Sequence, residues 1–256
     1  MQNLKVTLVQ ADQIWEDKEA NCRNYDRLLT GIDTDLIVLP EMFQTGFSMN
    51  VNSLSEDYGS SNSIEWLQGI SKEKDAAIYT SLILKDGSDI YNRGVFIKPS
   101  GEIETYDKRK SFGLAGEDHF FSAGKSETIV NYKGWNIQLQ ICYDLRFPEI
   151  VRNRILSNQK PAYDVILYVA NWPAKRSLHW NTLLNARAIE NQSFVIGVNR
   201  VGQDQKGHQY TGDSKMISPL GEEQPLTKNN EEIKTFVLEM NVLEEIREML
   251  PFLKDR

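Results

Sequence analysis

The sequence lacks several features that define whole classes of protein. Only two of its 256 residues are cysteine, Cys22 and Cys142, which excludes a disulfide-stapled scaffold and favours a reducing, cytoplasmic location. No apolar run, such as 165–170, approaches the roughly 18 residues of a membrane-spanning helix. Lys and Arg number 29 against 36 Asp and Glu, a net charge of −7. The chain therefore lacks the cationic excess with which proteins bind nucleic acid or an anionic membrane.

Sequence motifs for common cofactors are missing as well. There is no Walker loop for nucleotide phosphates, no Gly-x-Gly-x-x-Gly for dinucleotides and no His-Glu-x-x-His for zinc. The Gly-x-Ser-x-Gly elbow of serine hydrolases is also absent. We therefore expect no metal and no organic cofactor, so that side chains alone carry the chemistry.

The composition, 40% hydrophobic and 25% charged, is that of a folded globular chain. Short runs rich in Val, Ile and aromatic residues predict strands, and apolar residues at helical spacing between them predict helices. Because some strands are continuously apolar and others alternate, we predict an α/β fold with a mixed sheet. No repeat or linker divides residues 1–256, which favours a single domain. The predicted strands are 4–9, 36–39, 76–84, 94–97, 135–142, 165–170, 194–198 and 236–240.

Cys142 ends the alternating strand 135–142 and precedes a predicted turn and helix. Reactive groups in α/β proteins gather beyond the carboxyl ends of strands, and a helix N-terminus or a nearby cation favours the thiolate. A thiol nucleophile needs a base, and none of the three histidines lies in a cysteine-proteinase signature. Cys142 is the candidate nucleophile, whereas Cys22 lies on the apolar face of a predicted helix and is expected in the core.

Two charged residues could complete a reaction site around Cys142. Glu41 follows the apolar run 36–39 and Pro40, where burial would raise the pKa of its carboxyl towards a value that suits a general base. Lys108 follows 102–106, and a fixed ammonium there could stabilise an oxyanion. Taken singly, Glu41 also fits a solvated loop acid and Lys108 a surface charge cluster. Only the combination favours catalysis.

Three segments resemble the Glu-Lys-Cys signature of the nitrilase superfamily of carbon-nitrogen hydrolases. They are L-P-E-M-F around Glu41, Y-D-K-R around Lys108 and C-Y-D-L-R-F-P from Cys142, in this order. Their spacings are 108 − 41 = 67 and 142 − 108 = 34 residues. The similarity spans nearly the whole chain and continues through 171–173, 187–191, 197–200, 212–214 and 219–221.

The resemblance implies a four-layer α-β-β-α sandwich with two mixed sheets, and a homodimer that forms through helices. It also implies that Glu41 is the general base, Cys142 the nucleophile, and Lys108 with the backbone N–H of Tyr143 the oxyanion donors. A second glutamate of the family matches Glu117 and would hydrogen-bond to the lysine or to the attacking groups.

The segments 106–117 and 171–173 are most similar to the omega-amidase branch. The resemblance implies hydrolysis of the terminal amide of short dicarboxylate monoamides such as 2-oxoglutaramate, 2-oxosuccinamate and succinamate. The distal carboxylate of such a substrate needs a cation, for which Arg146 is the first candidate; an ion pair of Arg146 with Asp144, Glu149 or a partner subunit is the alternative. The expected substrate-binding residues are Tyr143, Arg146, Phe43 and Trp172.

Two other functions fit the sequence. One is another hydrolase with the same three groups, such as a different amidase, a nitrilase or a carbamoylase, which would differ in pocket shape and leaving group. The other is a non-catalytic interaction protein that retains the scaffold. Release of ammonia without carbon dioxide from a monoamide would distinguish an omega-amidase from the other hydrolases. An unreactive Cys142 thiol would favour the interaction protein.

Overall fold

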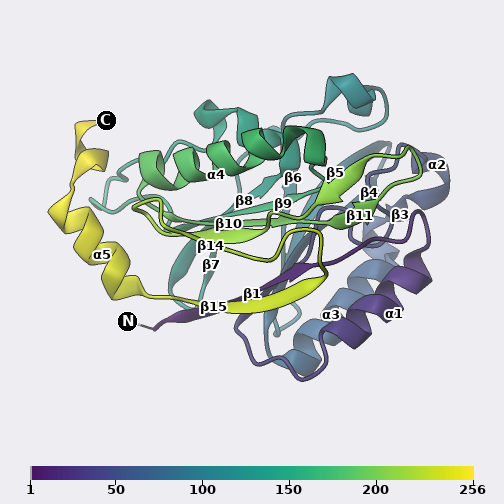
Figure 1. The fold of residues 1–256 in the computed structure, drawn as a ribbon, viewed down its shortest axis with the longest axis horizontal. Helices are drawn as coiled ribbons and strands as arrows, with labels where there is room; N and C mark the ends of the chain where they lie inside the picture. The colour runs from purple at the N-terminus through teal and green to yellow at the C-terminus, as the bar shows by residue number, and fades with distance from the viewer. Residues whose placement is uncertain (1) are drawn as a thin grey trace.

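Two mixed β-sheets form the centre of the computed structural model, which describes residues 2–256 (Figure 1). In the first sheet the strand order is β15-β1-β2-β4-β5-β6, and β3 pairs with β4. β1 is parallel to β2 and antiparallel to β15, so both kinds of pairing occur. The strands are β1 (Leu4–Gln10), β2 (Leu36–Val38), β3 (Glu56–Asp57), β4 (Ala77–Asp86), β5 (Asp89–Ile97), β6 (Ile103–Asp107) and β15 (Glu232–Leu238).

The second sheet has the strand order β14-β13-β10-β9-β8-β7. Its central strands β8, β9 and β10 are parallel, whereas β7 and β13 pair antiparallel at the sides. A separate hairpin is formed by β11 (Val201–Gln203) and β12 (Gln209–Thr211). The strands of the second sheet are β7 (Ile129–Tyr132), β8 (Trp135–Ile141), β9 (Val165–Ala170), β10 (Phe194–Asn199), β13 (Lys215–Ile217) and β14 (Glu223–Pro225).

Helices cover the outer face of each sheet and produce four layers, as Figure 1 shows. α1 (Lys18–Leu28) and α3 (Asn62–Lys74) lie on one side, and α4 (Ser177–Asn191) lies on the other. Two shorter helices, α2 (Val51–Leu54) and α5 (Met240–Met249), lie at the ends of the sandwich. The predicted α/β four-layer sandwich with two mixed sheets is therefore confirmed.

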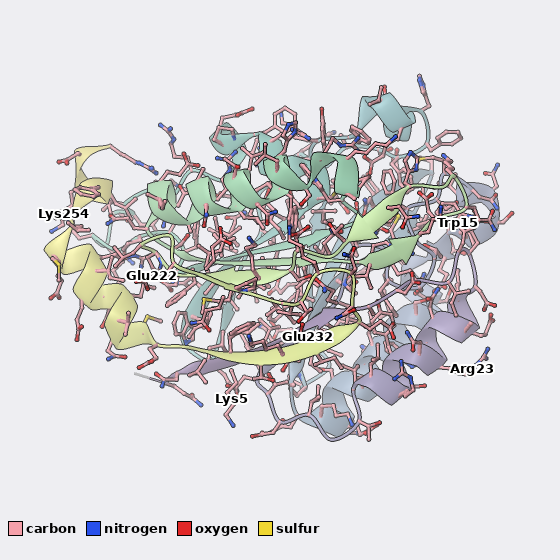
Figure 2. All side chains as sticks on the ribbon, in the orientation of Figure 1. Lys5, Trp15, Arg23, Glu222, Glu232 and Lys254 are labelled. Atoms are coloured by element: carbon pink, nitrogen blue, oxygen red, sulfur yellow. The ribbon has the colours of Figure 1, made fainter. Side chains whose placement is uncertain are left out.

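Side chains alternate along β2, so the first sheet contributes residues to one hydrophobic core on each of its faces. Successive residues of a strand point to opposite faces. Leu36 and Val38 belong to the core that contains residues of the second sheet, such as Leu167. Ile37, between them, packs with residues of α1 and α3, such as Leu67. Figure 2 shows side chains filling the space between the sheets, while charged residues such as Lys254 lie at the periphery.

The eight predicted strands are all present, and the strand at 165–170 has the predicted ends, whereas the ends of the others differ. The largest difference is at 236–240, where the strand spans Glu232–Leu238 and Met240 begins α5. Short polar strands such as β14 were not predicted, because an exposed edge strand needs no apolar alternation. No helix within residues 2–256 is long and apolar enough to cross a membrane.

Candidate active site

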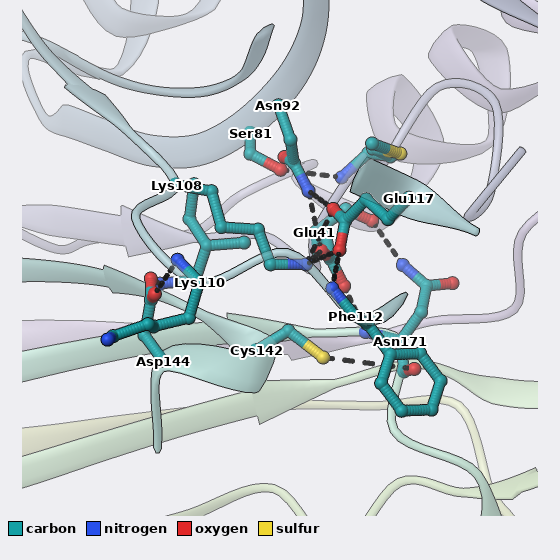
Figure 3. A network of polar contacts seen from close by, with 12 residues as sticks. Glu41, Ser81, Asn92, Lys108, Lys110, Phe112, Glu117, Cys142, Asp144 and Asn171 are labelled. Carbon is teal, nitrogen blue, oxygen red and sulfur yellow. Dashed lines mark hydrogen bonds and ion pairs between the residues drawn. The ribbon is translucent and has the colours of Figure 1, made fainter. Parts of the chain in front are cut away.

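Side chains that follow strand ends in both sheets meet in one buried cluster (Figure 3). Lys108 comes directly after β6 and Glu41 three residues after β2, both in the first sheet. Cys142 and Asn171 come directly after β8 and β9 of the second sheet. Hydrogen bonds to Glu41 span 67 residues from Lys108 and 130 residues from Asn171. Packing of the two sheets therefore assembles the cluster.

Lys108 lies between two carboxylates. Its Nζ donates to Glu117 Oε1 at 2.8 Å, to Glu117 Oε2 at 2.9 Å and to Glu41 Oε1 at 3.1 Å. Burial lowers the pKa of Lys108, but the charges of Glu117 and Glu41 outweigh this effect and hold that pKa above its ordinary value. The ammonium therefore stays protonated, and only 3% of the residue is exposed.

The carboxylate of Glu41 is fully buried and has donors on both oxygens. Oε1 accepts from Asn92 Nδ2 at 2.8 Å in addition to Lys108, and Oε2 accepts from the backbone N–H of Asn171 at 2.8 Å. The side chain of Asn171 also donates to the backbone carbonyl of Glu41 at 2.6 Å. Glu117 is held in turn by the backbone N–H of Phe112 at 2.6 Å. Such charge-assisted hydrogen bonds fix the carboxylates in place.

Cys142 stands at a strained turn between β8 and a short 3-10 helix, Cys142–Arg146. Its backbone has φ of 44°, in the left-handed region that non-glycine residues avoid, and strain of this kind clusters at functional sites. The thiol Sγ lies 4.0 Å from the carbonyl of Asn171. Burial raises the pKa of the Cys142 thiol, the charge and hydrogen bond of Glu41 raise it further, and Lys108 opposes both. A thiol so placed needs a base to lose its proton.

Asp144 forms hydrogen bonds both to the turn that carries Cys142 and to the segment that carries Lys108. Its carboxylate accepts from the backbone N–H of Ile141 at 3.0 Å, from that of Lys110 at 3.0 Å and from the hydroxyl of Tyr106 at 2.9 Å. These bonds join the residue before Cys142 to the segment that follows β6. Burial raises the pKa of Asp144 to about 7.

A cavity of about 210 Å³ opens above this cluster. Cys142, Lys108 and Asn171 lie at its base, and aromatic side chains such as Trp172 form its walls. Besides Lys108, its basic lining residues are Arg146, Arg176 and Lys206, and His208 and Asp204 also line it. No group of three or more His, Cys, Asp or Glu side chains suited to hold a metal ion occurs in the described part of the chain. The arrangement places a thiol and a buried ammonium at the floor of a small cavity, with the buried carboxylate of Glu41 hydrogen-bonded to that ammonium.

Comparison with known proteins agrees with this geometry. The sequence profile of the carbon-nitrogen hydrolase family matches residues 5–248. The omega-amidase YafV of Yersinia enterocolitica is 44% identical over 259 aligned positions, covering 100% of this chain and 97% of the relative. A 2-oxoglutaramate amidase of Bacillus subtilis is 32% identical and covers 86% of this chain and 84% of its own. Among solved structures, the CN-hydrolase superfamily protein XC1258 of Xanthomonas campestris has a TM-score of 0.97 at 36% identity, covering 100% of this chain and 98% of that one.

The chain belongs to the carbon-nitrogen hydrolase family. The predicted assignment to the nitrilase superfamily, on its omega-amidase branch, is confirmed, and so is the prediction of an amide-hydrolysing enzyme. The solved structure with an arsenic adduct in its active site shares this fold over 98% of its length.

Arg146 of this carbon-nitrogen hydrolase lies in the cavity wall, and within residues 2–256 it forms no ion pair with a carboxylate. The two predicted partners are engaged elsewhere, Asp144 as described and Glu149 with Lys110 at 3.8 Å. The guanidinium instead stacks over the ring of Trp172, 4.6 Å from its centroid, and contacts His179 Nδ1 at 3.2 Å. Burial and the charge of Arg176 lower the pKa of Arg146, so an anion between the two cations would be favourable.

Phe43 corrects one expectation. It was expected to bind substrate, but it is fully buried beneath the first sheet, where it stacks with Trp66 and packs edge-on against Tyr25. Phe47, four residues later, lines the cavity instead, with its ring 5.1 Å from Lys108 Nζ. The turn after β2 bends sharply at Met42, whose φ is 46°, and so reverses which side chains face the cavity. Tyr143, Arg146 and Trp172 do line it.

Two residues of the buried cluster were not among the candidates from sequence. Asn171 stood within a family-like segment but had no assigned role. Asn92 lies in the middle of β5, outside the predicted strand 94–97, and its burial to 1% exposure is visible only in the structure.

Proposed function

We propose that the enzyme hydrolyses the terminal amide of short dicarboxylate monoamides, 2-oxoglutaramate, 2-oxosuccinamate and succinamate among them. The observation that supports this most is a thiol and an ammonium bonded to a carboxylate at the floor of a cavity whose wall carries Arg146, a cation with no carboxylate partner among residues 2–256. A substrate with an amide at one end and a carboxylate at the other matches both features. The names of the similar amidases point to the same substrates.

The proposed reaction begins with proton transfer from Cys142 to Glu41 as the sulfur attacks the amide carbon. The resulting oxyanion is held by the Lys108 ammonium and the backbone N–H of Tyr143. An N–H at the start of a helix has no partner within that helix, so the second residue of the 3-10 helix is free to donate.

Glu41 then returns its proton to the amide nitrogen, which leaves as ammonia, and the carbonyl stays bound to Cys142 as a thioester. A water molecule that gives a proton to Glu41 attacks this thioester, and the acid departs as the thiol is restored. Glu117 keeps Lys108 in place throughout through two hydrogen bonds. No step calls for a metal or an organic cofactor.

The enzyme is further proposed to act as a homodimer in the reducing cytoplasm. Apolar side chains are exposed on the outer side of α4, with Leu178 at 76% and Ile189 at 54%. Leu220, which is 50% exposed, lies between β13 and the edge strand β14. Exposed apolar patches of this kind mark protein interfaces. Sedimentation velocity should show a dimer for the wild type and a smaller species for Leu178→Asp.

A panel of amides tests the activity. Purified enzyme should release ammonia, without carbon dioxide, from 2-oxoglutaramate and succinamate, while propionamide and aliphatic nitriles should be nearly inert. Rapid hydrolysis of nitriles, or carbon dioxide release from carbamoyl compounds, would instead indicate a nitrilase or a carbamoylase. If no compound reacts and Cys142 resists a thiol alkylator, the chain is a non-catalytic protein on this scaffold.

A further inference from the structure

The carboxylate of Glu41 has two oxygens that are not equivalent. Each carboxylate oxygen offers two lone-pair sites. Oε1 already accepts two donors, Asn92 Nδ2 at 2.8 Å and Lys108 Nζ at 3.1 Å. Oε2 accepts a single donor, the backbone N–H of Asn171 at 2.8 Å. Only Oε2 therefore keeps a lone pair that can take up a proton.

Oε2 is also the oxygen on the side of the thiol. Asn171 donates its N–H to Oε2, and the carbonyl of the same residue lies 4.0 Å from Cys142 Sγ. Figure 3 shows Asn171 and Cys142 on one side of Glu41, with Asn92 on the other. The free lone pair therefore faces the group that must give up a proton.

The orientation of Asn92 has a definite cause. Its Nδ2 donates to Glu41 Oε1 and, at 3.2 Å, to Glu117 Oε1, so one amide group bridges two carboxylates. The reversed amide would place Oδ1 against both negative oxygens. In the observed orientation Oδ1 is buried without a partner, an arrangement that stability alone does not favour. The backbone carbonyl of Asn92 also accepts from the N–H of Lys108 at 3.0 Å.

We propose that Asn92 is a positioning residue, which occupies Oε1 of Glu41 together with Lys108 and so leaves Oε2 as the oxygen that exchanges protons with Cys142 and water. This role rests on the proposed function, in which Glu41 is the general base. Without the amide, a proton can settle on Oε1, where it faces away from the thiol. Catalysis would then slow while the cavity that binds substrate stays intact.

Asn92 also stabilises the negative charge of Glu41 through its hydrogen bond to Oε1. The ionisable groups that face Glu41 from the surrounding elements are Lys108, Glu117, Cys142 and Tyr79. A hydrogen bond to a carboxylate favours its charged form. Loss of the amide should therefore remove a donor that stabilises the carboxylate, and the acid limb of the kcat/KM profile should move to higher pH.

Asn92→Ala tests the proposal, with Asn153→Ala as a matched control. Asn153 is another fully buried asparagine whose Nδ2 donates to two acceptors, the carbonyls of Tyr163 and Asn191, outside the cavity. Steady-state kinetics with succinamate between pH 5 and 10 and a thermal melt are measured for each. Asn92→Ala should lower kcat about tenfold or more with KM little changed, and shift the acid limb up by about one pH unit. Asn153→Ala should lower the melting temperature only.

Wild-type kcat and an unmoved acid limb in Asn92→Ala would overturn the proposal, as would losses that merely follow the melting temperature in both variants. Should Asn92→Ala not fold, the isosteric Asn92→Asp serves instead, and its added negative charge should move the acid limb further in the same direction. Cys142→Ala distinguishes a failure of the proposed function from a failure of the role of Asn92. If it stays active, the proposed function fails; if it is inactive while Asn92→Ala keeps the wild-type profile, only the role of Asn92 fails.

Discussion

The floor and the rim of the active-site cavity are built in different ways. At the floor, Glu41, Lys108 and Glu117 are at most 3% exposed and are joined by hydrogen bonds of 2.8 to 3.1 Å. At the rim, Lys206 and His208 are exposed on the β11–β12 hairpin, and Arg146 touches only aromatic and imidazole groups. Charges that are buried and fixed act strongly on a reaction, whereas water screens exposed ones. The floor should therefore determine the rate, and the rim the choice of substrate.

The largest effect should come from the thiol at the floor. Cys142→Ala should lower ammonia release from succinamate by about 10⁴-fold or more, because no other group can form the thioester. Cys22→Ala, which removes the other thiol, should remain active. Mass spectrometry of wild-type enzyme should map an acyl adduct to Cys142, and substantial turnover by Cys142→Ala would contradict its role as nucleophile.

The next effect concerns the buried ammonium. Lys108→Ala should lower kcat by roughly 10² to 10³-fold, as removal of an oxyanion donor does, and Lys108→Arg should not restore it because a planar guanidinium cannot replace a compact ammonium. Lys215→Ala is the control, since Lys215 is a buried lysine paired with Glu223 away from the cavity. If Lys108→Ala raises KM alone, the ammonium serves ground-state binding instead.

A smaller effect is expected at the rim. Wild-type enzyme should prefer succinamate to butyramide, and Arg146→Ala should reduce the ratio of their specificity constants by about 10- to 100-fold, since only succinamate pairs with the guanidinium. The exposed Lys206→Ala should change this ratio little. Equal constants for both amides on wild type would refute carboxylate selection. Retained selection in Arg146→Ala would transfer the role to Arg176, which lines the same cavity, ahead of Arg109 and Lys175.

The smallest predicted change is a shift in thiol ionisation. Burial raises the pKa of Cys142, Glu41 raises it further and Lys108 lowers it, so Glu41→Gln should move the midpoint of thiolate formation to lower pH. Thiolate absorbance against pH, in a background that carries Cys22→Ala, measures this midpoint. A midpoint that stays in place or rises in Glu41→Gln would show that the carboxylate does not act on the thiol.

Part of the fold and of the site was predictable from local pattern. Apolar runs predicted strands, and charged or thiol residues directly after them predicted a site at strand ends. Glu41, Lys108 and Cys142 do meet there, and Glu117, which the resemblance implied, joins them from the 3-10 helix Glu117–His119. Phe43, which was expected to bind substrate, does not reach the cavity, because after the left-handed turn at Met42 its ring packs in the core beneath the sheet.

The sequence by itself determined the strands, the α/β class with mixed sheets and the residue types at the strand ends, because alternation and apolar runs are local properties that burial selects, whereas the four layers were implied by the resemblance to the nitrilase superfamily. Only the tertiary structure decided that Asn92 bridges Glu41 and Glu117, and that Arg146 has no carboxylate partner within the described chain. The physical reason is that hydrogen-bond partners distant in sequence are chosen by how the two sheets pack. The bond from Asn92 to Glu41 spans 51 residues and that from Asn171 spans 130, and no local pattern encodes either distance.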